Sequence, residues 1–63
     1  MAQSKKYGSL DTELTKAIMK LFKLREGYLY ASRRDESSEW RVVHRWQGHR
    51  ETLGTLKEIL GQL

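Results

Sequence analysis

The sequence predicts a small α+β domain built as a helix, a two-stranded antiparallel β-hairpin and a second helix, an αββα order. Apolar residues recur at helical spacing near the start of the chain and again at its end. The segment between them alternates aromatic or β-branched residues with charged ones. A chain of 63 residues has room for one core. We therefore expect a single domain over residues 9–63, preceded by a flexible basic arm at residues 1–8.

The first helix is expected from about Leu10 to Glu26. Ser9 or Asp11 can cap its N-terminus, and Gly27 supplies the left-handed residue that commonly ends a helix. The apolar side chains fall on one arc of the helix, and a lysine stripe falls on the opposite side. The arc consists of Leu10, Leu14, Ala17, Ile18, Leu21, Phe22 and Leu24, and the lysine stripe consists of Lys16, Lys20 and Lys23.

The hairpin is expected between Tyr28 and Gly48. Its loop, around Asp35 to Glu39, lacks glycine, so four or five residues fit better than a tight two-residue turn. Alternation in the second strand predicts that Trp40, Val42, His44 and Trp46 face the core, together with Leu29 and Ala31 of the first strand. His44 then makes a structural hydrogen bond at the edge of the core. The opposite, open face would carry Tyr28, Tyr30, Arg34, Arg41 and Arg45.

A second amphipathic helix is expected to close the chain. Gly48 ends the hairpin, and His49 and Arg50 fall in the loop that follows. The helix begins near Thr52, or as late as Thr55, where Glu58 has the spacing of a capping box. Its apolar arc consists of Leu53, Leu56, Ile59, Leu60 and Leu63.

The composition excludes several classes of protein. The absence of cysteine removes disulfides and thiolate metal sites, and two histidines are too few for a closed zinc site. No apolar run approaches the length of a membrane span or of a signal-peptide core, so we expect a cytoplasmic protein without membrane contact. We see no nucleophile with a base, no phosphate loop and no paired carboxylates. A non-enzyme without metal or cofactor is therefore expected.

Dimerisation is a natural expectation for so small a core. Two helices can cover only one face of a two-stranded ribbon, which is marginal on its own. A homodimer that joins two hairpins into one shared sheet would stabilise both chains. Alternatively, the leucines of the second helix form the dimer seam.

The charge balance favours an acidic partner, because 12 Lys and Arg against 8 Asp and Glu give a net charge of +4. The leading hypothesis is a small accessory or regulatory protein that binds DNA or RNA through the open face and the lysine stripe. The alternative is an adaptor or inhibitor that docks on an acidic protein or adds its hairpin edge to another sheet. Two further interpretations stay open: a purely structural Tyr–Arg face, and lysines that form only the solvated side of a helix.

Overall fold

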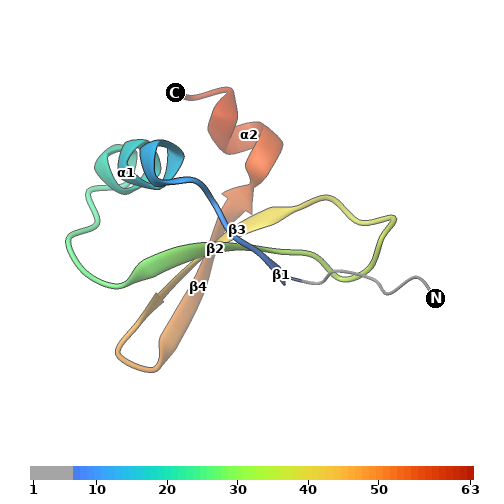
Figure 1. The fold of residues 1–63 in the computed structure, drawn as a ribbon, viewed down its shortest axis with the longest axis horizontal. Helices are drawn as coiled ribbons and strands as arrows, with labels where there is room; N and C mark the ends of the chain where they lie inside the picture. The colour runs from blue at the N-terminus through green and yellow to red at the C-terminus, as the bar shows by residue number, and fades with distance from the viewer. Residues whose placement is uncertain (1–6) are drawn as a thin grey trace.

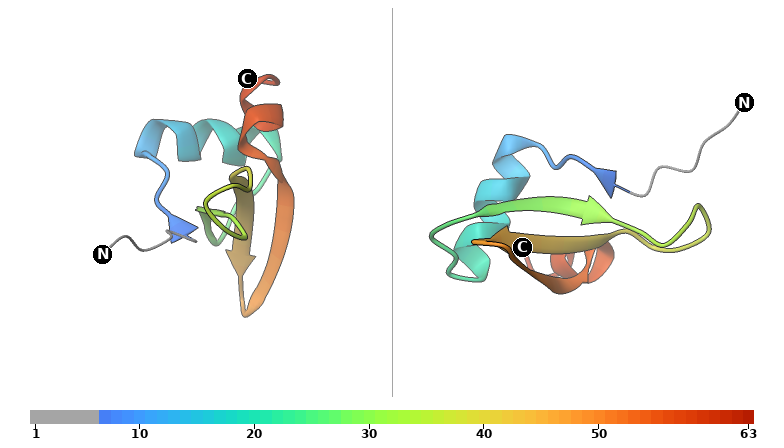
Figure 2. Two further views of the ribbon diagram at one scale, coloured as in Figure 1. Left: turned by 90° about the vertical axis from the view of Figure 1, so that its right-hand side faces the viewer. Right: turned by 90° about the horizontal axis from the view of Figure 1, so that it is seen from below.

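The structure is a computed structural model that describes residues 7–63. It holds two helices and one four-stranded antiparallel sheet in the order β1-β2-β3-β4. Both helices lie on the same side of the sheet, and the turn between β3 and β4 projects away from them (Figures 1 and 2). The elements are β1 (Tyr7–Gly8), α1 (Thr12–Leu21), β2 (Tyr28–Ser32), β3 (Arg41–Trp46), β4 (His49–Thr55) and α2 (Leu56–Leu60).

The predicted αββα fold with a two-stranded hairpin is therefore wrong. The expected hairpin corresponds to β2 and β3, and each of its outer edges gains a further strand within the same chain. Of the predicted basic arm, residues 1–6 lie outside the described residues. Its last two residues, Tyr7 and Gly8, form β1 and pair with Ser32 and Ala31.

Helix α1 begins where the sequence indicated. Asp11 is the N-cap, and its carboxylate accepts a 2.7 Å hydrogen bond from the backbone N–H of Leu14. Ile18 lies on the apolar arc, one turn after Leu14, and is fully buried. The helix therefore turns this arc toward the sheet and its lysines toward solvent.

The end of α1 differs from the prediction, which placed it just before Gly27. The helix ends at Leu21, because Lys23 takes the left-handed conformation with φ of 57°. The backbone N–H of Leu24 then donates to the carbonyl of Met19 at 2.8 Å, which is the bond that defines a Schellman motif. A lysine in this position carries a steric cost that glycine avoids, and this is why the sequence pointed to Gly27.

Replacement of Lys23 by glycine should therefore stabilise the protein. Relief of the left-handed strain outweighs the extra backbone entropy of glycine, which gives a net gain of about 0.5–1 kcal/mol in the free energy of unfolding. Urea unfolding followed by circular dichroism measures it. The matched control is Lys20→Gly inside the helix, which should lose about 1 kcal/mol. A loss of the same size in Lys23→Gly would contradict the Schellman ending.

Strand β4 was not predicted, because the residue pattern of this segment is ambiguous between helix and strand. Gln47 and Gly48 both have positive φ, 49° and 79°, so they form a two-residue turn of type I′ that matches the twist of a hairpin. Gly48 was predicted to end the only hairpin, but it lies in the turn of a second hairpin formed by β3 and β4. Leu53 keeps helical spacing to Leu56, although it lies in β4. The start of α2 after Thr55 agrees with the later of the two predicted positions.

The pairing of β4 with β3 contains a β-bulge. Val42 pairs with Gly54 and Val43 pairs with Thr52, so Leu53 is the extra residue on β4. Gly54 has φ of 151°, a conformation that other residues rarely adopt. The bulge lets the partly buried Leu53 pack on the core, and β4 then leads directly into α2.

The core lies between the two helices and one face of the sheet. Its buried cluster consists of Ile18, Leu29, Val42 and Ile59, from α1, β2, β3 and α2. The predicted burial of Leu29 and Ala31 is confirmed, at 7% and 5% exposure. The predicted burial of Trp46 is wrong, because this side chain is 39% exposed near the projecting turn.

Two carboxylates hold local structure together at the surface. Asp35 accepts hydrogen bonds from the hydroxyl of Ser37 at 2.7 Å, from its backbone N–H at 2.9 Å and from the hydroxyl of Ser38 at 3.0 Å. These bonds, the Ser37 hydroxyl first, lower the pKa of Asp35. Glu58 completes the predicted capping box, and the backbone N–H and the hydroxyl of Thr55 lower its pKa.

These lowered pKa values predict a loss of stability in acid. Each carboxylate has a lower pKa folded than unfolded, so its hydrogen bonds contribute fully above the ordinary values of 3.8 and 4.5. The contribution disappears as the pH falls below these values. Unfolding temperatures measured from neutral pH to about pH 3 should decline over this window. Glu58→Gln should have a flatter profile than the wild type, and an equally steep profile would contradict this role for Glu58.

Candidate functional site

The face of the sheet turned away from the helices carries three tyrosines and three arginines. Partners in an antiparallel sheet project to the same side, so register alone places its side chains. We call this surface the open face. Its three cross-strand rows are Tyr28, Arg45 and Arg50; Tyr30, Val43 and Thr52; and Tyr7, Ser32 and Arg41.

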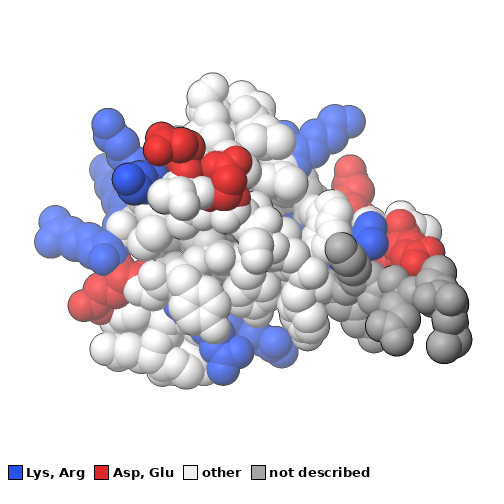
Figure 3. Space-filling view, in the orientation of Figure 1, with Lys and Arg blue, Asp and Glu red and all other residues white. Residues whose placement is uncertain are grey.

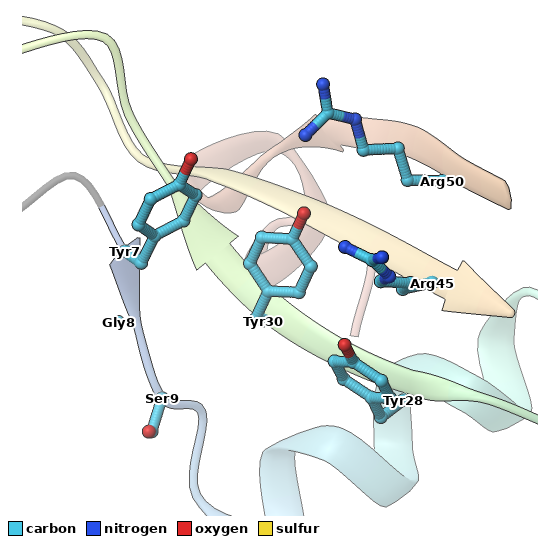
Figure 4. A pocket seen from close by; sticks show the side chains of 7 residues that line it. All are labelled: Tyr7, Gly8, Ser9, Tyr28, Tyr30, Arg45 and Arg50. Atoms are coloured by element: carbon cyan, nitrogen blue, oxygen red, sulfur yellow. The ribbon is translucent and has the colours of Figure 1, made fainter. Parts of the chain in front are cut away.

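Three tyrosine rings form a connected line on the open face. The ring centroid of Tyr30 lies 5.9 Å from that of Tyr7 and 6.1 Å from that of Tyr28. Tyr7 is 64% exposed and Tyr28 is 56% exposed, so both rings present their surface to solvent. Figure 4 shows Tyr30 between the other two rings. Aromatic residues exposed together in this way offer stacking surfaces to a planar partner.

Two arginines border the tyrosines from the neighbouring strands. Arg45 on β3 pairs with Tyr28 on one side and with Arg50 of β4 on the other. Both arginines are exposed, and their guanidinium groups extend toward the side on which the tyrosines lie (Figure 4). Together the side chains border an open groove of about 430 Å³, lined by Tyr7, Gly8, Ser9, Tyr28, Tyr30, Arg45 and Arg50.

The floor of the open face is apolar. Val43 occupies the middle row between Tyr30 and Thr52 and is only 6% exposed. It lies outside the core cluster, on the opposite side of the sheet. Val43 is therefore covered by its neighbours on the open face and does not itself line the groove.

Only some of the predicted site residues come together. Tyr28, Tyr30 and Arg45 lie together on the open face and line the groove. Arg41 is on the same face but in the third row, opposite Ser32. The placement of Arg34 on this face is wrong, because β2 ends at Ser32 and Arg34 lies in the loop that follows.

The lysine stripe belongs to another surface. Lys16, Lys20 and Lys23 are exposed on and just after α1, which packs its Ile18 into the core on the helix side of the sheet. The sheet therefore separates these lysines from the open face. Figure 3 shows Lys and Arg in several separate groups on the side of the molecule that it presents.

Two functional side chains of the groove, those of Arg50 and Tyr7, were not among the predicted site residues. Arg50 was assigned to a loop, whereas it lies on β4 directly opposite Arg45. Gly48 was the signal that could have found it, because glycine suits the second central position of a two-residue hairpin turn. Tyr7 was assigned to the arm, and a strand of two residues leaves no periodicity to detect.

The other side of β3 has a structural role. The Nε2 of His44 donates a 2.7 Å hydrogen bond to the backbone carbonyl of Glu26, and the indole N–H of Trp46 donates to the carboxylate of Glu26 at 2.5 Å. The prediction of a structural histidine is confirmed. These bonds fasten the segment before β2 to β3, and so they fix the position of Tyr28.

Two classes of site are not seen in the described part of the chain. Within residues 7–63, no three His, Cys, Asp or Glu side chains lie close enough together to hold a metal ion. The same residues include no helix with the length and apolar character needed to cross a membrane. Comparison of the chain with known protein families, curated proteins and solved structures gives no significant match.

Proposed function

We propose that this protein binds nucleic acid, without catalysis, through the open face of its sheet. The observation that carries the proposal is that Tyr7, Tyr28 and Tyr30 lie on one exposed face beside Arg45 and Arg50. Guanidinium groups bind phosphate oxygens with paired hydrogen bonds, and tyrosine rings stack on bases. Exposed sheet surfaces that carry aromatic side chains are a recurring means of binding bases.

The charge of the open face supports a polyanionic partner. Its three rows contain Arg41, Arg45 and Arg50 and no carboxylate. The net charge of the whole chain, +4, also attracts a polyanion, and it does so at longer range. A face that served only to stabilise the sheet would gain from carboxylates opposite these arginines, because cross-strand pairs of opposite charge are favourable.

Heteronuclear NMR titration with DNA and RNA, in single-stranded and duplex form, tests the proposal. Resonances of Tyr7, Tyr30 and Arg45 should shift at low salt and shift less at physiological salt, because phosphate contacts release counterions. An unchanged spectrum with every nucleic acid at low salt would refute the proposal.

A second candidate function is protein contact, favoured by an apolar patch on the helix side. Trp40, Leu56 and Leu60 border a shallow hollow with Glu39 and Lys57 at its margin. Leu60 is 48% exposed, and together with Trp40 and Leu56 it forms an apolar surface open to solvent. The patch carries one acid and one base, so a two-fold axis can place the Glu39 of one copy against the Lys57 of another. We therefore infer a second copy of this chain as its partner.

Sedimentation at several protein concentrations tests this dimer. The wild type should shift from monomer toward dimer as concentration rises, and Leu60→Glu should remain monomeric. A monomeric wild type at high micromolar concentration would exclude the patch as a dimer interface. Nucleic-acid binding by the open face does not depend on the result, because the two surfaces lie on opposite sides of the sheet.

A further inference from the structure

We infer that the open face selects an unpaired segment of nucleic acid, whose bases stack on the three tyrosines while its phosphates lie along the arginines. This inference rests on the proposed nucleic-acid binding and specifies the form of the ligand. Two independent features carry it: the spacing of the rings, and the order of residue types across the strands.

The spacing of the rings fits bases that are separated from one another. The centroids are 5.9 and 6.1 Å apart, and the ring planes are inclined by 58° and 38°. The rings therefore lie side by side and do not stack on each other. Successive bases in a duplex strand rise by about 3.4 Å and cover each other's faces. A base can rest on each ring only where the strand is extended and its bases are unstacked.

The order of the strands fits a single backbone. Tyrosines come from β1 and β2, and the arginines come from β3 and β4. Arg45 lies beside Tyr28 at one end of the line of rings, and Arg41 lies in the row of Tyr7 at the other end. Positive charge therefore flanks the line of rings at both ends. An extended single strand has the same two-sided form, with bases on one side and phosphates on the other. In a duplex the base faces are stacked on one another and the phosphates lie on the outside. The tyrosine rings would therefore meet no free base face.

Tyr30 should contribute most to the preference for single-stranded over duplex nucleic acid. Tyr30 is the middle ring of the line and lies between Tyr7 and Tyr28. Loss of one base–aromatic stack weakens binding by about 5- to 150-fold. Phenylalanine keeps the stacking face and removes only the hydroxyl, so Tyr30→Phe should bind within a few-fold of the wild type.

Fluorescence anisotropy with labelled single-stranded DNA and RNA, and with duplexes of the same length and ionic strength, tests the inference. We expect the wild type and Tyr30→Phe to bind single strands more tightly than duplexes. Tyr30→Ala should lose most of this preference while retaining a wild-type circular dichroism spectrum. If Tyr30→Ala fails to fold, Tyr28→Ala replaces it, because Tyr28 is 56% exposed and can be removed without a cavity.

The possible outcomes test the selection of unpaired bases separately from the proposed nucleic-acid binding. Equal affinity for duplex and single strand would overturn the selection of unpaired bases and leave nucleic-acid binding intact. Unchanged single-strand affinity in the folded alanine variant would overturn the stacking role of the tyrosines. No binding to any of the nucleic acids would refute the proposed function itself.

Discussion

Replacement of Gly27 by alanine is expected to unfold a large part of the protein at room temperature. Gly27 has φ of 85°, and a Cβ atom there would lie 2.3 Å from the backbone carbonyl oxygen of Arg45. It would also lie 2.8 Å from Nε2 of His44 and 2.9 Å from Cβ of Trp46. The left-handed backbone costs about 1–3 kcal/mol, and the forced separation from β3 costs about as much again. Their sum is close to the whole stability of about 3–5 kcal/mol typical of such a small core.

Gly48→Ala is the matched control for this prediction. Gly48 has nearly the same φ, 79°, but no atom lies within 4 Å of the position its Cβ would take. Only the conformational cost of about 1–2 kcal/mol should appear. Chemical unfolding followed by circular dichroism compares the two variants. If they lose the same stability, the close approach of Gly27 to β3 does not contribute, and Glu26 alone holds the two segments together.

The parts of the fold that the sequence predicted correctly carry strong local signals. Asp11 and Thr55 are caps with a side-chain oxygen at the right spacing, and both cap helices in the structure. The strand from Arg41 to Trp46 has a clear run of β-branched and aromatic residues. The error in α1 arose at Lys23, because tertiary packing imposed a left-handed conformation that the residue type does not favour.

The fourth strand shows why part of the site escaped prediction. Residues 49–55 contain charged residues, glycine and one leucine in helical spacing with the next, so neither period dominates. Pairing with β3 decides their conformation, and pairing is a non-local property. Because Arg50 reaches the groove only through this pairing, the sequence could place Tyr28 and Arg45 together but could not add Arg50 to them.

Removal of the arginine pair should abolish most nucleic-acid binding, whereas removal of two lysines should not. Arg45→Ala with Arg50→Ala takes away the two cations that border the tyrosines. Each charge-assisted hydrogen bond lost costs about 1.5–3 kcal/mol, so affinity should fall by about 100-fold or more. The slope of log affinity against log salt should also decrease by about 1.4, because each phosphate contact to a single strand contributes about 0.7.

The lysine pair supplies a control with the same change in charge. Lys16→Ala with Lys20→Ala also removes two positive charges, but from exposed positions of α1 on the other side of the sheet. Screening at physiological salt limits charge effects to about 8 Å, so this variant should bind almost as the wild type there and lose affinity only at low salt. Equal losses in the two variants, with equal changes in salt slope, would show that binding follows net charge and not the open face. A larger loss in the lysine variant would move the interface to α1, where the tyrosines could take no part in it.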